Sequence, residues 1–368
     1  MTHLFELNTD VTYLNCASMS PLLKSARQAG LASLEARATP WNMTSKEWFD
    51  DSEILRDLVA KVFQTSSSNI AFSPSASYGM AMVAKNIRLK KGQSIVIIEK
   101  QFPSNVYVWE DMARKFDLNL LRVKKENDRP LTESILRSIE SNTGLIAIPN
   151  CHWMDGAYID LEKVSKKAKS VGALLVLDLS QSLGALPTNI EKIDPDFAVA
   201  AGYKWMLGPY GLGYMYIAPR WQQVWEPLEH SWLVRHNSED FSKLTDYTQV
   251  FKPGAKKFDA GEYLMLNLRP MAIAAVEQIL SWGVDKVQSS VKQLTNIIKE
   301  YNTSKGIQIP ESVGHIVAIP YGSNDPEKIR KAIAAKNISV SYRDTYIRVS
   351  PHLYNSKEEI EKLLECVG

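Results

Sequence analysis

The hydrophobic pattern between residues 70 and 217 alternates between two kinds of segment. Short runs such as "SIVIIE", "GLIAIP", "LLVLDL" and "FAVAA" are apolar at successive positions, as strands are when both faces of a parallel sheet are covered. Segments between them, such as "DLEKVSKKAKSVG", carry apolar residues at helical spacing. This alternation predicts an α/β fold with a mostly parallel sheet and helices on both of its faces.

The pattern changes after residue 265. A long helical segment, "LRPMAIAAVEQILSWG", precedes a second helix, three short strands ("GHIVAIP", "ISVSY" and "YIRVS") and two further helices. We therefore predict a large α/β domain over residues 20–265. A smaller α+β domain is predicted from residues 266–368 together with residues 1–19.

Composition and charge argue against several classes of function. The 368 residues carry a formal net charge of +2, and 45% of them are hydrophobic and 23% charged, as in a soluble globular protein. No basic run indicates nucleic-acid binding, and no apolar run approaches the roughly 18 residues of a membrane span. Cys16, Cys151 and Cys366 are far apart and odd in number, which fits neither a disulfide framework nor a zinc site. We expect no nucleic-acid, membrane or metal partner, and a cytoplasmic location.

Unusual polar residues stand at the carboxyl ends of predicted strands, the edge at which open α/β sheets bind ligands. Asp178 ends one strand and Lys204 follows another, while Ser75 and Ser77 stand directly before a predicted helix. The free N–H groups of such a helix suit a phosphate. Each residue alone has an ordinary structural explanation, as a cap or a surface group. Together they predict pyridoxal 5'-phosphate (PLP), which needs a lysine for its aldehyde, a carboxylate for its ring nitrogen and donors for its phosphate.

Two long stretches, "LLVLDLSQSLGALPTNI" and "DFAVAAGYKWMLGPYGLGYMYI", resemble the central block of class V aminotransferase-like enzymes, which are PLP enzymes of fold type I. "YLNCASMSPL" is similar to the opening motif of that family, and "YIRVSPHLYNSKEEIEKL" to its closing motif. The resemblance spans nearly the whole chain. It implies a large domain with a mostly parallel seven-stranded sheet, a smaller α+β domain and a PLP cofactor. Kynureninases, isopenicillin N epimerase-like proteins and cysteine desulfurases belong to this superfamily.

The resemblance also implies roles for the residues that match the motifs of the family. Lys204 would carry the cofactor as a Schiff base, Asp178 would pair with the pyridinium nitrogen, and Gln181 would bond the phenolic oxygen. Phe102, in "EKQFPSN", would stack on the cofactor ring, with ordinary core packing as the alternative. The residues implied at the phosphate are Ser75, Ala76, Ser77, Ser180 and Tyr203.

Three residues are predicted on the substrate side. Arg348, in "YIRVSPH", matches the arginine that binds a substrate carboxylate, a task suited to a guanidinium because it offers two parallel hydrogen bonds. A surface salt bridge is the alternative. Asn15, in the opening motif, is predicted to bind substrate. His152 is predicted to be catalytic, near the phenolic oxygen, with a structural histidine as the alternative.

The stretch "FDAGEYLMLN" resembles the segment that relatives send into the active site of a partner subunit, which implies a homodimer. Many relatives have Gly-Thr where this chain has Gly261-Glu262. A carboxylate would repel phosphate, so the phosphate contact across the interface is in doubt. The aromatic and basic stretch "WEPLEHSWLVRHN", residues 225–237, is predicted to line or cover the site, with Trp232, Arg235 and His236 as candidates for specificity. A surface loop with buried aromatic residues is the alternative.

The resemblance leaves the reaction open, because a fold does not determine an activity. We expect a PLP-dependent enzyme acting on an amino acid or related amine, either a transaminase or a kynureninase- or epimerase-like lyase or isomerase. The alternatives are a C–S or C–Se lyase of the selenocysteine lyase type and a catalytically inactive scaffold. A nucleotide-binding protein would need glycines that "SPSAS" lacks. A persulfide-forming desulfurase is disfavoured because the only cysteine after Cys151 is Cys366, at the end of the sequence.

Overall fold

The computed structural model describes residues 1–8, 10–126, 128–307, 311–343 and 345–368. Its main feature is a seven-stranded sheet with the order β2-β8-β7-β6-β5-β3-β4. The strands are β2 (Ile70–Ser73), β3 (Ser94–Ile98), β4 (Asn119–Val123), β5 (Thr143–Pro149), β6 (Leu174–Asp178), β7 (Phe197–Ala201) and β8 (Gly213–Ile217). All neighbours from β7 to β4 pair in parallel, and β8 is antiparallel to both β2 and β7. The predicted α/β class and mostly parallel sheet are confirmed.

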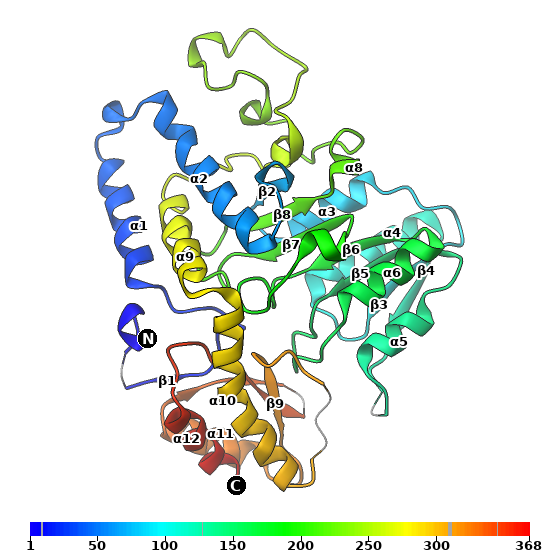
Figure 1. Ribbon diagram of the computed structural model, residues 1–368, viewed down its shortest axis with the longest axis vertical. Helices are drawn as coiled ribbons and strands as arrows, with labels where there is room; N and C mark the ends of the chain where they lie inside the picture. Colours follow the sequence, from blue (N-terminus) through cyan, green and yellow to red (C-terminus); the bar gives the residue numbers. More distant parts are fainter. Residues whose placement is uncertain (9, 127, 308–310, 344) are drawn as a thin grey trace.

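Helices cover both faces of this sheet (Figure 1). Successive strand residues point to opposite faces, so Ile95 and Ile97 join the core beneath one helical layer while Val96 and Ile98 join the other core. One layer contains α3 (Ala76–Asn86) and α4 (Tyr107–Phe116). The other contains α2 (Ser45–Phe63), α5 (Leu131–Ser138), α6 (Leu161–Val171) and α9 (Arg269–Trp282), with α1 (Lys24–Ala36) packed against α9. Two short helices, α7 (Ile190–Ile193) and α8 (Pro219–Gln222), lie in the connections around β7 and β8.

A second group of elements surrounds a small antiparallel sheet of order β11-β12-β9. The helix α10 (Val284–Ser304) continues from α9 into this group, which lies at the lower end of the molecule in Figure 1. Its other elements are β9 (Val317–Pro320), α11 (Pro326–Ala335), β10 (Ile338–Ser339), β11 (Ser341–Tyr342), β12 (Tyr346–Val349) and α12 (Lys357–Val367).

The N-terminal residues pack with this C-terminal group. The strand β1 (Thr12–Tyr13) pairs in parallel with β10, and Asn15 forms a bridge with Ser350. The predicted strand "ISVSY" is split, because β10 pairs with β1 and β11 pairs with β12. The domain boundaries at residues 19/20 and 265/266 stay a prediction.

Candidate active site

A cavity of about 290 Å³ opens at the carboxyl ends of β5, β6 and β7. Its wall contains the last residue of each of these strands, Pro149, Asp178 and Ala201. The position agrees with the rule for open α/β sheets. All the residues that the sequence predicts for the cofactor line this one cavity: Ser75, Ala76, Ser77, Phe102, Asp178, Ser180, Gln181, Tyr203 and Lys204.

Lys204 lies in the turn after β7 and is only 6% exposed. Its Nζ lies 5.1 Å from the ring centre of Phe102 and 5.6 Å from that of Tyr203. Among the described residues, none accepts a hydrogen bond from this amine. Burial lowers the pKa of Lys204 to about 8, although the nearby charge of Asp178 opposes the shift. An amine that loses its proton this readily is a usable nucleophile near neutral pH.

Asp178 and Ser180 join the ends of two strands beside Lys204. The Asp178 carboxylate accepts a hydrogen bond from Ser180 N at 3.0 Å, and Ser180 Oγ accepts one from Ala201 N at 3.1 Å. Because a hydroxyl is also a donor, Ser180 keeps its own hydrogen for a group in the cavity. Among the described lining residues, Asp178 and Lys204 are the ones with charged side chains.

The first turn of α3 faces the cavity. This helix begins at Ala76, so Ser75 is its N-cap and Ser77 lies inside the first turn, which corrects the prediction that both serines precede the helix. Ser75 Oγ accepts a hydrogen bond from Tyr78 N at 3.1 Å and lies 2.9 Å from Ser77 Oγ. The N–H groups of Ala76 and Ser77 have no acceptor within the helix. They and the hydroxyls form a cradle that suits a phosphate.

Aromatic side chains form another part of the wall. The rings of Phe102 and Trp153 meet edge to face, with centres 5.5 Å apart, and Trp153 Nε1 donates to Lys100 O at 2.8 Å. Tyr203 and Tyr210 pair with ring centres 4.6 Å apart. Both pairs line the cavity, so a flat aromatic ligand has rings on more than one side.

Arg348 and Asn15 form a separate cluster that is not part of this wall. Arg348 lies on β12 and is 2% exposed. Its Nη1 donates to Trp153 O at 3.0 Å, and its Nη2 donates to Asn15 Oδ1 at 3.3 Å and to Ser341 Oγ at 3.1 Å. Burial lowers the pKa of Arg348 to about 10, so the group is still a cation at neutral pH. The cluster is joined to the cavity through Trp153.

The structure does not bring His152 to the cavity. Its Nε2 lies 3.3 Å from Glu99 O, and its Nδ1 lies 3.4 Å from an Asp155 carboxylate oxygen. The neighbouring residues Cys151 and Trp153 line the cavity instead. These contacts match the structural alternative for this histidine, and the catalytic role stays a prediction.

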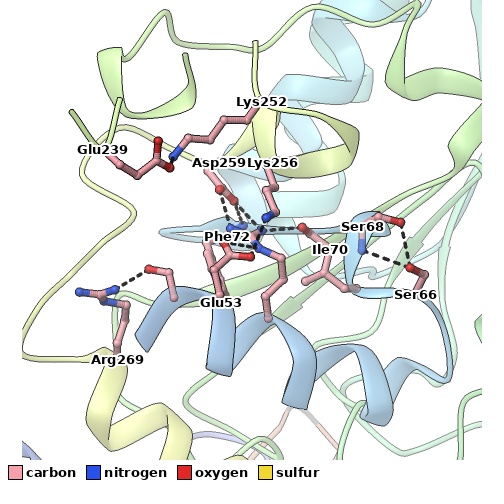
Figure 2. Close-up of polar contacts among 12 residues, drawn as sticks. Glu53, Ser66, Ser68, Ile70, Phe72, Glu239, Lys252, Lys256, Asp259 and Arg269 are labelled. Carbon is pink, nitrogen blue, oxygen red and sulfur yellow. Dashed lines mark hydrogen bonds and ion pairs between the residues drawn. The ribbon is translucent and has the colours of Figure 1, made fainter. Parts of the chain in front are cut away.

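A buried ion pair anchors the segment that begins at Asp259 (Figure 2). The Asp259 carboxylate accepts from Arg56 Nη2 of α2 at 2.8 Å and from Phe72 N of β2 at 2.7 Å. Gly261 N donates to the carboxylate of Glu229, while Glu262 is exposed. The segment is therefore fixed to β2, the strand that leads into the phosphate cradle.

The sequence profile described as "Aminotransferase class-V" matches residues 40–363. The chain belongs to this family. It is 24% identical to "Uncharacterized aminotransferase YcbU" of Bacillus subtilis (strain 168), over 98% of this chain and 95% of that protein. It is 26% identical to a "Probable cysteine desulfurase" of Methanothermobacter thermautotrophicus, over 85% of this chain and 82% of the relative.

The fold is likewise that of a solved cysteine desulfurase. The apo structure of the cysteine desulfurase from Thermococcus onnurineus NA1 superimposes with a TM-score of 0.85 at 20% identity, covering 99% of this chain and 95% of that one. Class V aminotransferase-like enzymes are PLP-dependent, and the predicted fold type I is confirmed.

Several cavity residues of this class V enzyme were not predicted from the sequence: Gln101, Ser104, Cys151, Trp153, Tyr210 and Leu212. Trp153 and Tyr210 could have been found, because both are large aromatic residues just beyond strand ends or beside the lysine turn. Burial raises the pKa of the Cys151 thiol, so it is a packing group here rather than a thiolate. Within the described residues no helix is long and apolar enough to cross a membrane, and no group of three or more metal-binding side chains occurs.

Proposed function

We propose that this class V enzyme uses Lys204 to bind PLP and acts on an amino acid or a related amine. The observation that carries the proposal is the buried Lys204 amine. It has a lowered pKa, lacks a hydrogen-bond acceptor among the described residues, and shares one cavity with Asp178 and the α3 cradle. A lysine held in this state fits an aldehyde, and the cradle fits a phosphate.

When bound, PLP supplies an aldehyde for an amine and a ring that draws electrons from the bonds at the substrate Cα. The chain would supply the rest. The Asp178 carboxylate would keep a proton on the ring nitrogen by charge attraction. Gln181 would donate to the phenolic oxygen, and the phosphate would be held by Ser77 together with Ser75, Ala76, Ser180 and Tyr203. Phe102 would cover one face of the ring and exclude water.

Lys204 would also move protons. With a pKa near 8, about a tenth of the amine is neutral at pH 7, against roughly one part in 3,000 for a lysine of pKa 10.5. Once the substrate amine has replaced Lys204 on the aldehyde, the freed Nζ would take a proton from the substrate Cα and return it.

Arg348 would bind the α-carboxylate of the substrate. Both Nη2 protons are already directed at Asn15 and Ser341, while Nε is buried without a partner among the described residues. A carboxylate that approaches Nε and Nη2 would therefore displace one of these neighbours. The main role of Asn15 would be to orient the Arg348 guanidinium, and direct contact with the substrate would be secondary.

The family catalyses several types of reaction, and our proposal selects among them. We favour a transaminase, or a lyase or isomerase of the kynureninase or epimerase type. A C–S or C–Se lyase remains the second candidate, supported by the desulfurase relative. Persulfide transfer is not favoured, because Cys366 Sγ donates to Lys362 O within α12 and Cys151 is fully buried.

We also propose a homodimer in a reducing cytoplasm. The cysteines of the described chain are unpaired. Tyr210 is 69% exposed although it lines the cavity, and Tyr247, which lies between β8 and α9 in the sequence, is 88% exposed. A second subunit would cover such surfaces. Sedimentation of a fully active monomer would contradict this part of the proposal.

The proposal is tested by adding PLP to the purified protein and recording the visible spectrum. We expect a yellow protein whose cofactor becomes fixed by borohydride, with peptide mapping placing the adduct on Lys204. Absence of uptake, or an adduct on another lysine, would show that the site is misassigned. Turnover assays over an amino-acid panel then separate transfer of the amino group from elimination and racemisation.

A further inference from the structure

Gln181 is held from behind by residues outside the cavity. Its Oε1 accepts a hydrogen bond from Trp205 Nε1 at 3.0 Å, and its Nε2 donates to Ala17 O at 3.0 Å. An amide nitrogen has two hydrogens, so one remains for a group in the cavity that Gln181 lines. The direction of that hydrogen depends on how firmly the whole residue is fixed.

The backbone of Gln181 has a partner that lies 134 positions away in the chain. His315, which precedes β9, places Nε2 at 2.6 Å from Gln181 O. Because a carbonyl can only accept, Nε2 carries the hydrogen. The ring also meets Trp205 edge to face, with centres 4.6 Å apart. His315 is fully buried, and burial lowers its pKa to about 4, so the donor is a neutral imidazole.

The backbone that carries His315 is held on two sides. Val313 N donates to Gly156 O at 3.0 Å, and Thr295 Oγ1 of α10 donates to Gly314 O at 2.7 Å. A side chain at Gly156 would place its Cβ 2.3 Å from Ile316 O, so the two backbones touch at that point. A histidine on such a fixed segment can position another residue with little freedom.

We propose that His315 is a positioning residue for cofactor binding. Its imidazole fixes the Gln181 backbone and supports Trp205, which in turn holds the Gln181 side chain and directly follows Lys204. The C-terminal group of elements thereby helps to set the hydrogen bond that Gln181 offers to the phenolic oxygen of PLP. This inference rests on the proposed function and adds to it a residue that does not touch the cavity.

The test uses two substitutions of His315 and one matched control. His315→Phe keeps a ring but loses the donor, whereas His315→Gln keeps an N–H near the position of Nε2. His352→Phe is the control. His352 is also fully buried, and the centre of its ring lies 6.0 Å from that of Trp205. Neither of its ring nitrogens forms a hydrogen bond with a described residue. The measurements are the PLP dissociation constant, the visible spectrum of bound PLP with its pH titration, and urea unfolding of the cofactor-free proteins.

We expect His315→Phe to raise the PLP dissociation constant about tenfold and to shift the spectral titration. His315→Gln should stay within about threefold of the wild type, and His352→Phe should change cofactor-free stability without the spectral shift. The proposal is overturned if both Phe variants bind PLP alike, or if His315→Gln is as weak as His315→Phe. A wild-type protein that binds no PLP would instead overturn the proposed function itself.

Discussion

The lowered pKa of Lys204 predicts how the free energy of unfolding of the cofactor-free protein depends on this residue. Burial lowers this pKa from 10.5 to about 8, and the side chain is only 6% exposed, so solvent screens it little. The amine has its ordinary pKa in the unfolded chain, so a charged Lys204 destabilises the fold at neutral pH. At about 1.4 kcal/mol per pKa unit, the cost is roughly 3 kcal/mol. Lys204→Met removes the charge while keeping a long unbranched side chain.

The pH dependence has a definite sign. Between pH 8 and 10.5 the unfolded chain still binds the Lys204 proton when the folded protein has lost it, so stability rises with pH in this window. The penalty in the wild type is complete below about pH 8 and vanishes near pH 10.5. The stability advantage of Lys204→Met should therefore shrink by about 3 kcal/mol across the window.

Urea unfolding of both cofactor-free proteins at a series of pH values measures this advantage. Taking the difference between the two curves cancels other titrations, such as that of Tyr214, whose pKa is raised by burial. Lys331→Met, at an exposed position of α11, is the control for the exchange of a lysine for a methionine and is measured over the same pH range. The free energy of unfolding of Lys204→Met minus that of the wild type should fall from pH 8 to 10.5. If it stays constant or grows, burial does not lower the pKa of the Lys204 amine.

Three further outcomes follow from the contacts. Asp259→Ala should lower the free energy of unfolding by about 3–5 kcal/mol, because it removes the buried carboxylate that pairs with the Arg56 guanidinium and leaves that group with the Glu53 carboxylate at 3.4 Å and Ile70 O. The double change Arg56→Met with Asp259→Leu should cost less, as urea unfolding can show. Arg348→Ala should lower kcat/KM for the substrate by on the order of tenfold to a hundredfold with PLP content retained. Arg348→Lys should also be impaired, because it loses the two parallel N–H donors of the guanidinium. Unchanged kcat/KM would exclude Arg348 from substrate binding. Gly184→Ala should destabilise the fold by roughly 1–3 kcal/mol in the same unfolding assay, since Gly184 has φ +91° and its Cβ would lie 2.4 Å from Trp205 O; wild-type stability would contradict this.

The sequence predicted the central sheet well because its inner strands are apolar on both faces. The edge strand β4 is different, since Leu121 is 38% exposed, and only its position in the alternation of strands and helices identified it. The order of the strands is not contained in hydrophobic periodicity and was not predicted, while the number of strands came from the family resemblance. The split of "ISVSY" into β10 and β11 depends on which distant strands they meet, which local pattern cannot show.

The gathering of the candidate cofactor residues around one cavity was predictable because they lie in contiguous motifs at strand ends. The loop after β5 was not, because neighbouring residues in extended chain point in opposite directions. Cys151 and Trp153 line the cavity while His152 turns to Glu99 and Asp155. An error of one residue in deciding which side chains of this loop face the cavity therefore makes a structural histidine look like a catalytic candidate.

The same loop explains how the two sides of the site are coupled. Trp153 contributes its ring to the cavity wall and its carbonyl to Arg348, so the cavity wall and the proposed carboxylate site share one residue. Three residues further on, Gly156 O accepts from Val313, beside the segment that carries His315. A displacement of β12 relative to β5 would therefore move the Trp153 ring against Phe102 as well as the guanidinium. With the roles proposed above, binding energy from a substrate carboxylate at Arg348 would reach the reacting centre through these contacts, where it would increase the rate rather than only the affinity.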